Sequence, residues 1–385
     1  MTIVGQNKAR NKTRTNNKEL AWAQGVINAN RDKPVMVTTH RNLQDAEDYS
    51  SDSILYLQTR FYDSGRIPDI WYSATGEVLY NPDGIYNQEF FDRFVATNPN
   101  IFLVNSGHDA QEYRQTSTNI FGEQVHEVMA DFTDLDNGGD GYLRIMEFDT
   151  QSDRIDVKSY SPTLDRYKTD SESQFSLNVD FDSYQDTSVA YFQNGVGGYN
   201  GTKDTWINED AKNSSYGNSS ILVADDDTDN HWWNDYQGQT LVGFDELTGE
   251  PIDGKIPAGA AIEKATLVLS VKEDVDISNR DFDVYQMTRD WNEGSTWNSL
   301  DNGLSGSDYG RRLGSFSGDD NPDDSEVRYI DITDAVQNWV DNPNSNYGVA
   351  IVTQQMNWNN DGIDLYSSEA SEIMFRPALV VDYAV

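Results

Sequence analysis

The sequence predicts two units in tandem, an α+β half followed by an all-β sandwich of the jelly-roll kind. Helical periodicity and short apolar strand runs alternate up to about residue 180, which is typical of an α+β unit. From about Thr187, short β-rich runs are separated by clusters of Asp, Asn, Gly and Ser, as in sandwiches and jelly rolls. We therefore place the units at residues 1–183 and 187–385.

The elements of the first unit follow from its apolar periodicity. We expect helices at Glu19–Asn30 and Gln88–Val95, each with apolar residues along one face. Residues 41–84 are rich in Tyr and Asp, and we expect a functional loop there because long structureless loops are uncommon. Strands are expected at Val35–Thr38, Ile101–Val104, Gln124–Asp131, Tyr142–Asp149 and Arg154–Tyr160.

The second unit reads as strands with one short helix, at Asp334–Val340. Three of its tryptophans, Trp291, Trp297 and Trp339, are expected to pack in the core or between strands. Strands are expected at Ser220–Ala224, Ala265–Lys272, Phe282–Met287, Val327–Ile332, Gly348–Thr353 and Ala378–Tyr383.

Composition excludes several classes of protein. The net charge of -37 over 385 residues opposes nucleic-acid binding, and it suits calcium binding or the high-salt surroundings of a marine or halophilic protein. The absence of cysteine excludes disulfides and thiolate metal sites. No apolar run is long enough to predict a membrane span. Met1–Lys18 is polar and basic and lacks the apolar region of a secretory signal.

Two histidines follow buried strands directly. His40 comes after Val35–Thr38, and His108 comes after the run that begins at Ile101. Strand ends hold imidazoles rigidly while loops leave room for a substrate, so both side chains are candidate ligands of a dinuclear metal site. His126 lies within a strand-like run, and we expect it to be structural.

Residues 18–180 resemble the C-terminal half of a calcineurin-like metallophosphoesterase. The resemblance rests on Leu20-Ala21-Trp22-Ala23, Val37-Thr38-Thr39-His40, Asn98-Pro99-Asn100-Ile101 and Ser106-Gly107-His108. It implies that His40 and His108 each bind one of two metals of the Mn, Fe or Zn kind. The family's last motif continues Gly-His-x-His, whereas here Ala110 replaces the second histidine, and the family's upstream Asp-x-His and Gly-Asn-His-Asp motifs are absent from this chain. We therefore expect this half to be inactive by itself.

The second unit resembles the DNRLRE-type carbohydrate-binding jelly roll. The matching segments include Gly201–Ile207, Ile262–Leu269, Trp291–Asn298, Ile330–Thr333 and Arg376–Leu379. The resemblance implies adhesion to polysaccharide, with acidic glycans such as alginate among the family's ligands. It also favours structural calcium near the ends of the domain, with Asp204 and Asp382 as the candidate ligands.

Sugar binding needs exposed aromatic faces ringed by a few fixed polar groups. The candidate platforms, all in polar surroundings, are Trp232, Trp233, Tyr236 and Trp358. An acidic glycan would also need cations, either bridging calcium or one of four basic residues, Lys255, Arg289, Arg311 and Arg312.

Two functions therefore stay open. The first is an extracellular or cell-surface glycan-binding, adhesive or structural protein that carries an inactive phosphoesterase half. The second is a metal-dependent phosphoesterase completed by a missing upstream piece or a second chain. Because an incomplete half would leave a sheet edge uncovered, we expect self-association or pairing with a complementary N-terminal half.

Overall fold

The computed structural model describes two compact units and leaves several segments undescribed. The described residues are 2–4, 17–39, 42, 87–107, 111–186, 188–226, 237–273, 281–318, 326–353 and 362–385. The first unit holds residues 1–23 and 30–187, and the second holds residues 24–29 and 188–385. Each unit has its own sheets and core.

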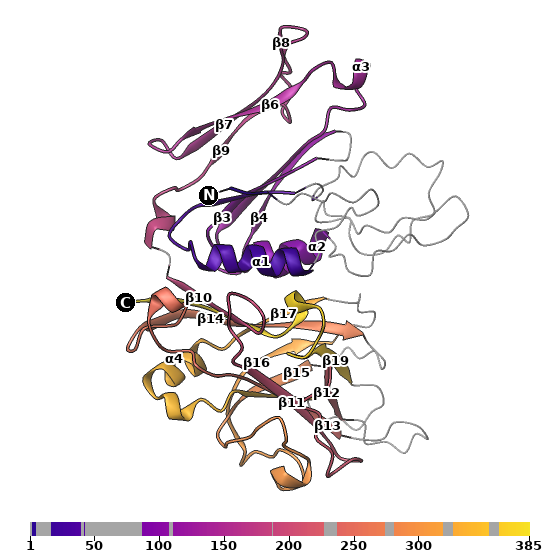
Figure 1. Ribbon diagram of the computed structural model, residues 1–385, viewed down its shortest axis with the longest axis vertical. Coiled ribbons are helices and arrows are strands. Elements are labelled where there is room, and N and C mark those ends of the chain that lie inside the picture. Colours follow the sequence, from indigo (N-terminus) through magenta and orange to yellow (C-terminus); the bar gives the residue numbers. More distant parts are fainter. Residues whose placement is uncertain are drawn as a thin grey trace, which may run out of the picture. The chain divides into compact units, whose positions relative to one another are not determined.

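A five-stranded sheet forms the centre of the first unit (Figure 1). Four of its strands run parallel and β4 runs antiparallel at one edge beside β5. The strands in spatial order are β1 (Thr2–Val4), β2 (Val35–Thr38), β3 (Ile101–Ser106), β5 (Gln124–Ala130) and β4 (Glu112–Thr118).

Helical segments lie against one face of this sheet. They are α1 (Asn17–Asn28) and α2 (Asn87–Phe90), and α2 continues as the π-helix η2 (Phe91–Val95). The predicted α-helix at residues 88–95 is thus half π-helical, because the Ala96 N–H bonds to the carbonyl of Phe91, whereas an α-helix would pair it with the carbonyl of Asp92. The apolar side chains of this segment are buried beneath the sheet.

A second, smaller sheet covers the other face. Phe102 and Val128 of the first sheet pack with Ile155, Val157 and Leu177 of the second to form one core. The first unit therefore has the α+β character that the sequence predicts. The strands of the small sheet are β6 (Leu143–Asp149), β7 (Arg154–Ser161), β8 (Arg166–Tyr167) and β9 (Gln174–Asn178), and α3 (Asp136–Gly139) is a single turn before β6.

The second unit is almost entirely β-structure. Its strands are β10 (Val189–Gln193), β11 (Thr202–Asn208), β12 (Ile221–Asp226), β13 (Gln237–Phe244), β14 (Ala261–Glu273), β15 (Asp281–Met287), β16 (Tyr309–Ser317), β17 (Val327–Asp331), β18 (Val349–Thr353), β19 (Ile363–Tyr366) and β20 (Ala378–Ala384). They are paired in the order β10-β20-β14-β19-β12-β13-β18-β15-β16, with β17 beside β14 and β11 beside β13.

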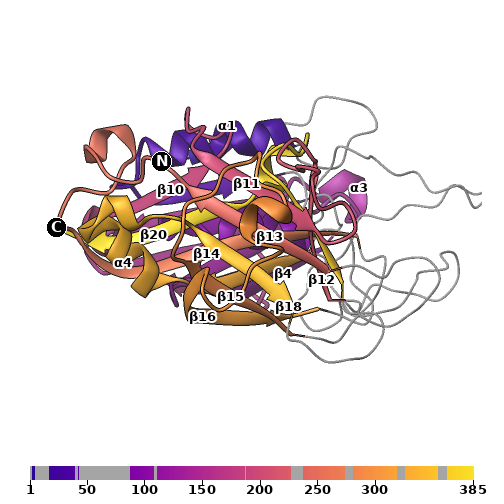
Figure 2. The ribbon, with the colours of Figure 1, turned by 90° about the horizontal axis from the view of Figure 1, so that it is seen from below.

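These strands form two layers around one core, as in a jelly-roll sandwich. Leu267 and Leu269 of β14 and Leu379 of β20 face Val242 of β13 and Ile351 of β18 across that core. The second layer runs in the order β13-β18-β15-β16, and Figure 2 shows these strands on one side of the unit. The predicted short helix is present as α4 (Thr333–Asp341), and its Trp339 is buried in the same core.

Short 3₁₀ helices also occur among the described residues. They lie at Ser183–Asp186, Pro251–Asp253, Asn298–Leu300, Pro343–Ser345 and Ile373–Phe375. Among the described residues, no helix is long and apolar enough to cross a membrane.

Candidate functional site

The two strands that precede the predicted metal ligands are neighbours. β2 and β3 pair in parallel, with Val37 opposite Val104, so their carboxyl ends meet at one edge of the sheet. This confirms the arrangement of strands on which the histidine prediction depends. His40 and His108 themselves lie outside the described residues, so their role as ligands stays a prediction.

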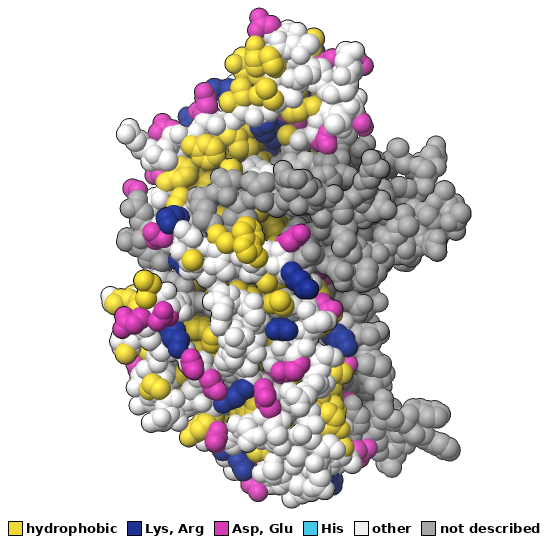
Figure 3. Space-filling view, viewed as in Figure 1, with side chains coloured by type: hydrophobic (Ala, Val, Ile, Leu, Met, Phe, Trp, Pro, Cys, Tyr) yellow, Lys and Arg dark blue, Asp and Glu magenta, His cyan; other side chains and the backbone are white. Residues whose placement is uncertain are grey.

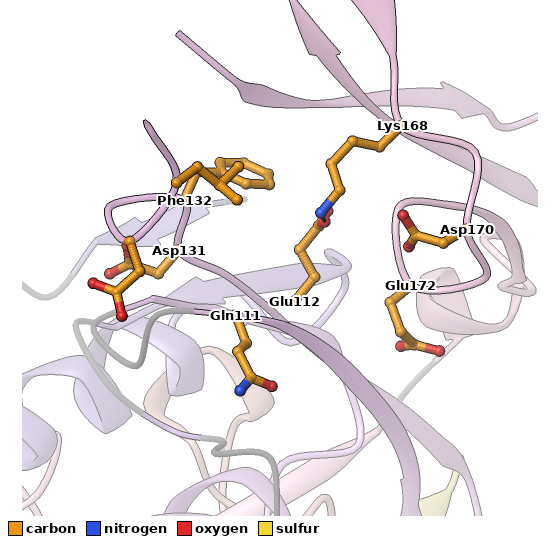
Figure 4. A pocket seen from close by; sticks show the side chains of 9 residues that line it. Gln111, Glu112, Asp131, Phe132, Lys168, Asp170 and Glu172 are labelled. Carbon is orange, nitrogen blue, oxygen red and sulfur yellow. Dashed lines mark hydrogen bonds and ion pairs between the residues drawn. The ribbon is translucent and has the colours of Figure 1, made fainter. Parts of the chain in front are cut away.

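A pocket of about 300 Å³ lies at this same edge of the first sheet (Figure 4). β5 runs parallel to β3, so Asp131 and Phe132 leave the sheet on the side where β3 ends, and β4 begins there with Glu112. The pocket is lined by Gln111, Glu112, Asp131, Phe132, Asp134, Leu135, Lys168, Asp170 and Glu172.

Glu112 is the most heavily bonded side chain of the pocket. Its carboxylate is 3% exposed and receives Arg144 at 2.6 Å, the Ser159 and Ser173 hydroxyls at 2.5 Å each, and Lys168. Burial raises the pKa of this carboxyl, but the bonds from Lys168 and the two serines and the charge of Arg144 outweigh it, so the pKa lies below its ordinary value. Glu112 is therefore a structural anion and is poorly suited to accept a proton in catalysis.

The rest of the pocket is acidic. Four carboxylates, from Asp131, Asp134, Asp170 and Glu172, line it together with one lysine that is already paired with Glu112. Such a surplus of negative charge repels a phosphate group and attracts a cation. The pocket by itself therefore offers no anion-binding site for a phosphoester.

His126 has a structural role, as its position in the sequence predicts. It lies within β5 and is 6% exposed. One ring nitrogen lies 3.0 Å from the Thr116 hydroxyl and the other lies 2.9 Å from the Asn178 carbonyl. Since both nitrogens are occupied, the ring joins β5 to β4 and to the second sheet.

In the second unit, an aromatic and charged patch lies on the outer face of β15 and β16. Phe282 and Val284 point into the core, so Asp283 and Tyr285 of β15 point the other way. The rings of Tyr285 and Tyr309 are 4.5 Å apart, and Arg312 donates to Asp283 at 2.6 Å. This combination of half-buried rings and fixed polar groups is typical of sugar-binding surfaces.

Sequence reasoning did not single out this tyrosine pair. Tyr285 and Tyr309 are 24 positions apart in the chain, and only the pairing of β15 with β16 brings Met287 opposite Tyr309 and Tyr285 opposite Arg312. The alternation of apolar and polar residues in Phe282–Tyr285 was the one signal available, because it places Tyr285 away from the core.

The four basic residues proposed as partners of an acidic glycan are all held in ion pairs. Each of them is paired with a carboxylate of its own unit, so the positive charge of each is already balanced. The pairs are Lys255–Glu246, Arg289 with Asp301 and Asp308, Arg311–Asp334 and Arg312–Asp283. On the face of this unit seen in Figure 3, acidic and basic side chains are interspersed.

The predicted sugar platforms Trp232, Trp233, Tyr236 and Trp358 lie outside the described residues. The strands that bound these segments are nevertheless described. β12 ends at Asp226, β13 begins at Gln237 and β18 ends at Thr353. Because β13 pairs with both β12 and β18, these three strand ends lie at the same end of the sheet. The three tryptophans expected in the core or between strands are all buried. Trp339, 2% exposed, lies in the sandwich core, whereas Trp291 and Trp297, each 3% exposed, lie in a second apolar cluster with Leu241 of β13 and Ala350 of β18.

The two carboxylates predicted to bind calcium are placed separately. Asp204 lies in β11, which pairs with β13, whereas Asp382 lies in β20 between β10 and β14. Burial and then repulsion from Glu263 raise the pKa of Asp382, and Lys264 lies close enough to offset part of this rise. The structure therefore does not join them in a single site.

Comparison with known proteins supports the carbohydrate-binding part of the sequence interpretation. The model of carbohydrate-binding module family 96 matches residues 198–383, which is most of the second unit. A curated relative, the uncharacterized protein YvnB of Bacillus subtilis (strain 168), is 34% identical over 105 residues. That match covers 24% of this chain and 8% of the relative, so the chain spans a small part of that protein's length.

Two solved structures align with the chain at low identity. The VP2 subviral particle of infectious bursal disease virus aligns over 63% of this chain and 75% of its own, at 9% identity and a TM-score of 0.12. The Gx strain of the same virus aligns over 71% of this chain and 76% of its own, at 8% identity and a TM-score of 0.12. Scores this low do not indicate a shared fold.

Proposed function

We propose that this protein binds polysaccharide through its second unit and acts as an extracellular or cell-surface adhesive or structural protein. The observation that carries the proposal is the match of residues 198–383 to a carbohydrate-binding module. The β-sandwich of this unit and the patch of Tyr285, Tyr309, Arg312 and Asp283 on its outer face are in accord with it. Sugar rings stack on such aromatic faces, and paired charges bind their hydroxyls.

The ligand we propose is an acidic polysaccharide, alginate among the candidates. The basic side chains expected to bind it are neutralised by carboxylates within the unit, so binding would depend on a bridging cation such as calcium. Trp232, Trp233, Tyr236 and Trp358 remain proposed as additional platforms.

Retention of the full chain on immobilised alginate, pectin and a neutral glucan, with and without calcium, tests the proposal. We expect retention on an acidic glycan, and Tyr285→Ala with Tyr309→Ala should weaken it by about 1–3 kcal/mol for a lost stacking face. The matched control is Tyr160→Ala with Tyr167→Ala, which removes a tyrosine pair of similar geometry, 4.7 Å between rings, from the first unit. Absence of retention on every glycan would overturn the proposal.

A second candidate function is phosphoester hydrolysis by a completed metal site. The observation that favours it is the parallel pairing of β2 and β3, whose following residues include His40 and His108. The residues to hold a metal pair would be these histidines together with ligands from another chain or an upstream piece. Mass spectrometry of the chain after dialysis against manganese, iron and zinc tests this: about two metals per chain support the function, and none argues against it. Glycan retention should survive His40→Ala in either case.

A further inference from the structure

A pocket of about 540 Å³ lies between two loops of the second unit. The first is the loop of residues 194–201, between β10 and β11, and the second is the loop of residues 245–260, between β13 and β14. Residues 25, 28 and 29, which belong to the same unit, also line it. Small-molecule sites typically have volumes of about 300–1,000 Å³. The described lining includes no residue of β15 or β16, so this loop pocket is separate from the tyrosine patch.

The first loop is held in one shape by its own hydrogen bonds. The Asn194 side chain bonds to the backbone carbonyl and N–H of Thr202 at 3.0 and 2.9 Å. The Tyr199 hydroxyl donates to the Asp245 carbonyl of the second loop at 2.9 Å. An ideal Cβ on Gly201 would lie 2.8 Å from both of these oxygens, so only glycine admits this contact. The Tyr199 ring is therefore fixed in the wall of the loop pocket.

Apolar side chains from both loops line the loop pocket. The Tyr199 ring is half-buried and meets the buried Phe192 ring edge to face, with 5.2 Å between their centres. Ile252 lines the pocket from the second loop and is 93% exposed. Aromatic side chains with an apolar face and a polar tip are suited to ligands that are themselves amphipathic, as a sugar ring is.

The second loop contributes a fixed ion pair. The Lys255 ammonium donates to the Glu246 carboxylate at 2.9 Å. Glu246 has a φ of +57°, a backbone conformation that few residues other than glycine adopt and that is concentrated at binding sites. An ideal Cβ on Gly249 would lie 2.7 Å from the Lys255 Cδ, so glycine leaves room for the lysine stem. The pair is thus held in place before any ligand arrives.

The charges of the loop pocket favour a neutral ligand. Glu246 and Asp253 bring two negative charges and Lys255 brings one positive charge, so the described lining is negative overall and repels an acidic sugar. A carboxylate accepts hydrogen bonds from hydroxyl groups and an ammonium donates to them. The ion pair can therefore bind two neighbouring hydroxyls of a neutral sugar, and such charge-assisted bonds are strong.

We propose that the loop pocket binds a short neutral saccharide, at a place separate from the site for an acidic polysaccharide. Tyr199 and Ile252 contact the apolar face of the sugar, and Glu246 and Lys255 bind its hydroxyl groups. The inference rests on the proposed function, because the match to a carbohydrate-binding module is what favours a sugar over other neutral ligands. The second unit then binds two kinds of sugar at two places.

Titration of the full chain with neutral disaccharides, in the presence of a chelator, tests the proposal. The probes are maltose, cellobiose, mannobiose and galactobiose, with digalacturonate as the acidic comparison. By calorimetry, we expect at least one neutral disaccharide to bind, and digalacturonate to bind about tenfold more weakly or worse. Lys255→Met, which keeps most of the stem, and Glu246→Gln should each weaken neutral binding by about tenfold or more, as expected for a lost hydrogen bond to a charged group.

The matched control is Arg311→Met. It breaks the ion pair with Asp334, which lines another pocket of the same unit, of about 290 Å³, and it should bind the neutral disaccharide as the wild type does. Because Glu246 is 75% exposed, Glu246→Gln should leave the thermal midpoint of the second unit unchanged, so that a loss of binding is not a loss of folding.

Two results would overturn the proposal: no binding of any neutral disaccharide, or binding that neither Lys255→Met nor Glu246→Gln weakens. Tyr285→Ala with Tyr309→Ala should weaken retention on an acidic glycan and leave neutral binding unchanged. Retention on alginate without neutral binding would refute the loop pocket alone. Neutral binding without retention on any acidic glycan would refute the acidic ligand of the proposed function alone.

Discussion

Replacing Glu112 by alanine should destabilise the first unit by about 3 kcal/mol. The Glu112 side chain is 3% exposed and that of its partner Arg144 is 8% exposed, so the change leaves a buried guanidinium without its carboxylate. Breaking a buried pair from one side costs about 3–5 kcal/mol. Arg144 keeps its bonds to the carbonyls of Met129 and Glu172, which places the expected loss at the lower end of this range.

Urea unfolding followed by hydrogen exchange of peptides from β6 and β7 would measure this loss in the first unit alone. Lys168→Ala is the matched control, because it removes the other cation on Glu112 from a side chain that is 28% exposed. It should cost about 1 kcal/mol or less, since solvent screens a partly exposed pair. If Glu112→Ala lies within about 1 kcal/mol of the wild type, or Lys168→Ala costs as much, the buried pair does not stabilise this unit as argued.

Three other predictions follow from the structure. The pKa of Glu112 is lower in the folded protein, so the ionised carboxylate stabilises the fold fully above the ordinary pKa of 4.5. This stabilisation is lost as the pH falls through the lower folded pKa. Glu112→Gln should therefore flatten the acid side of a plot of unfolding midpoint against pH. Gly348→Ala should lower the free energy of unfolding in urea by about 2–4 kcal/mol, because φ is +71° and a Cβ would lie 2.3 Å from the Val242 carbonyl oxygen. The control Gly254→Ala has a similar φ of +73° but open space around it, so it should lower the free energy of unfolding by only about 1–2 kcal/mol. Trp339→Ala should destabilise the second unit by about 3–5 kcal/mol in the same assay, and a loss below about 1 kcal/mol would contradict its place in the core.

Much of the secondary structure could be predicted because these elements have apolar residues at a regular period. Val35–Thr38 is β2 as predicted, and the runs beginning at Gln124 and Arg154 are β5 and β7. β4 was missed because Glu112–Thr118 has no apolar alternation, and it joins the sheet by backbone pairing at an edge. The helix predicted at residues 88–95 is partly π-helical, a change in hydrogen bonding that periodicity cannot reveal.

The side-chain clusters could not be predicted from the sequence for a different reason. The partners of Glu112 lie 32 to 61 residues away in the chain and come from several other segments. Tyr285 and Tyr309 likewise come together only through the pairing of β15 with β16. The spacing of residues along the chain predicts strands and helices, but it does not predict which side chains from distant segments come into contact.

The pairing of β10 with β20 has a consequence for how the second unit is made. These are its first and last strands, and Val189 lies opposite Asp382. β20 also pairs with β14, so on a ribosome the sandwich cannot close until β20 has been synthesised. Until then β10 and the part of β14 that pairs with β20 have an unpaired edge, where another chain could pair, and the net charge of -37 opposes such association.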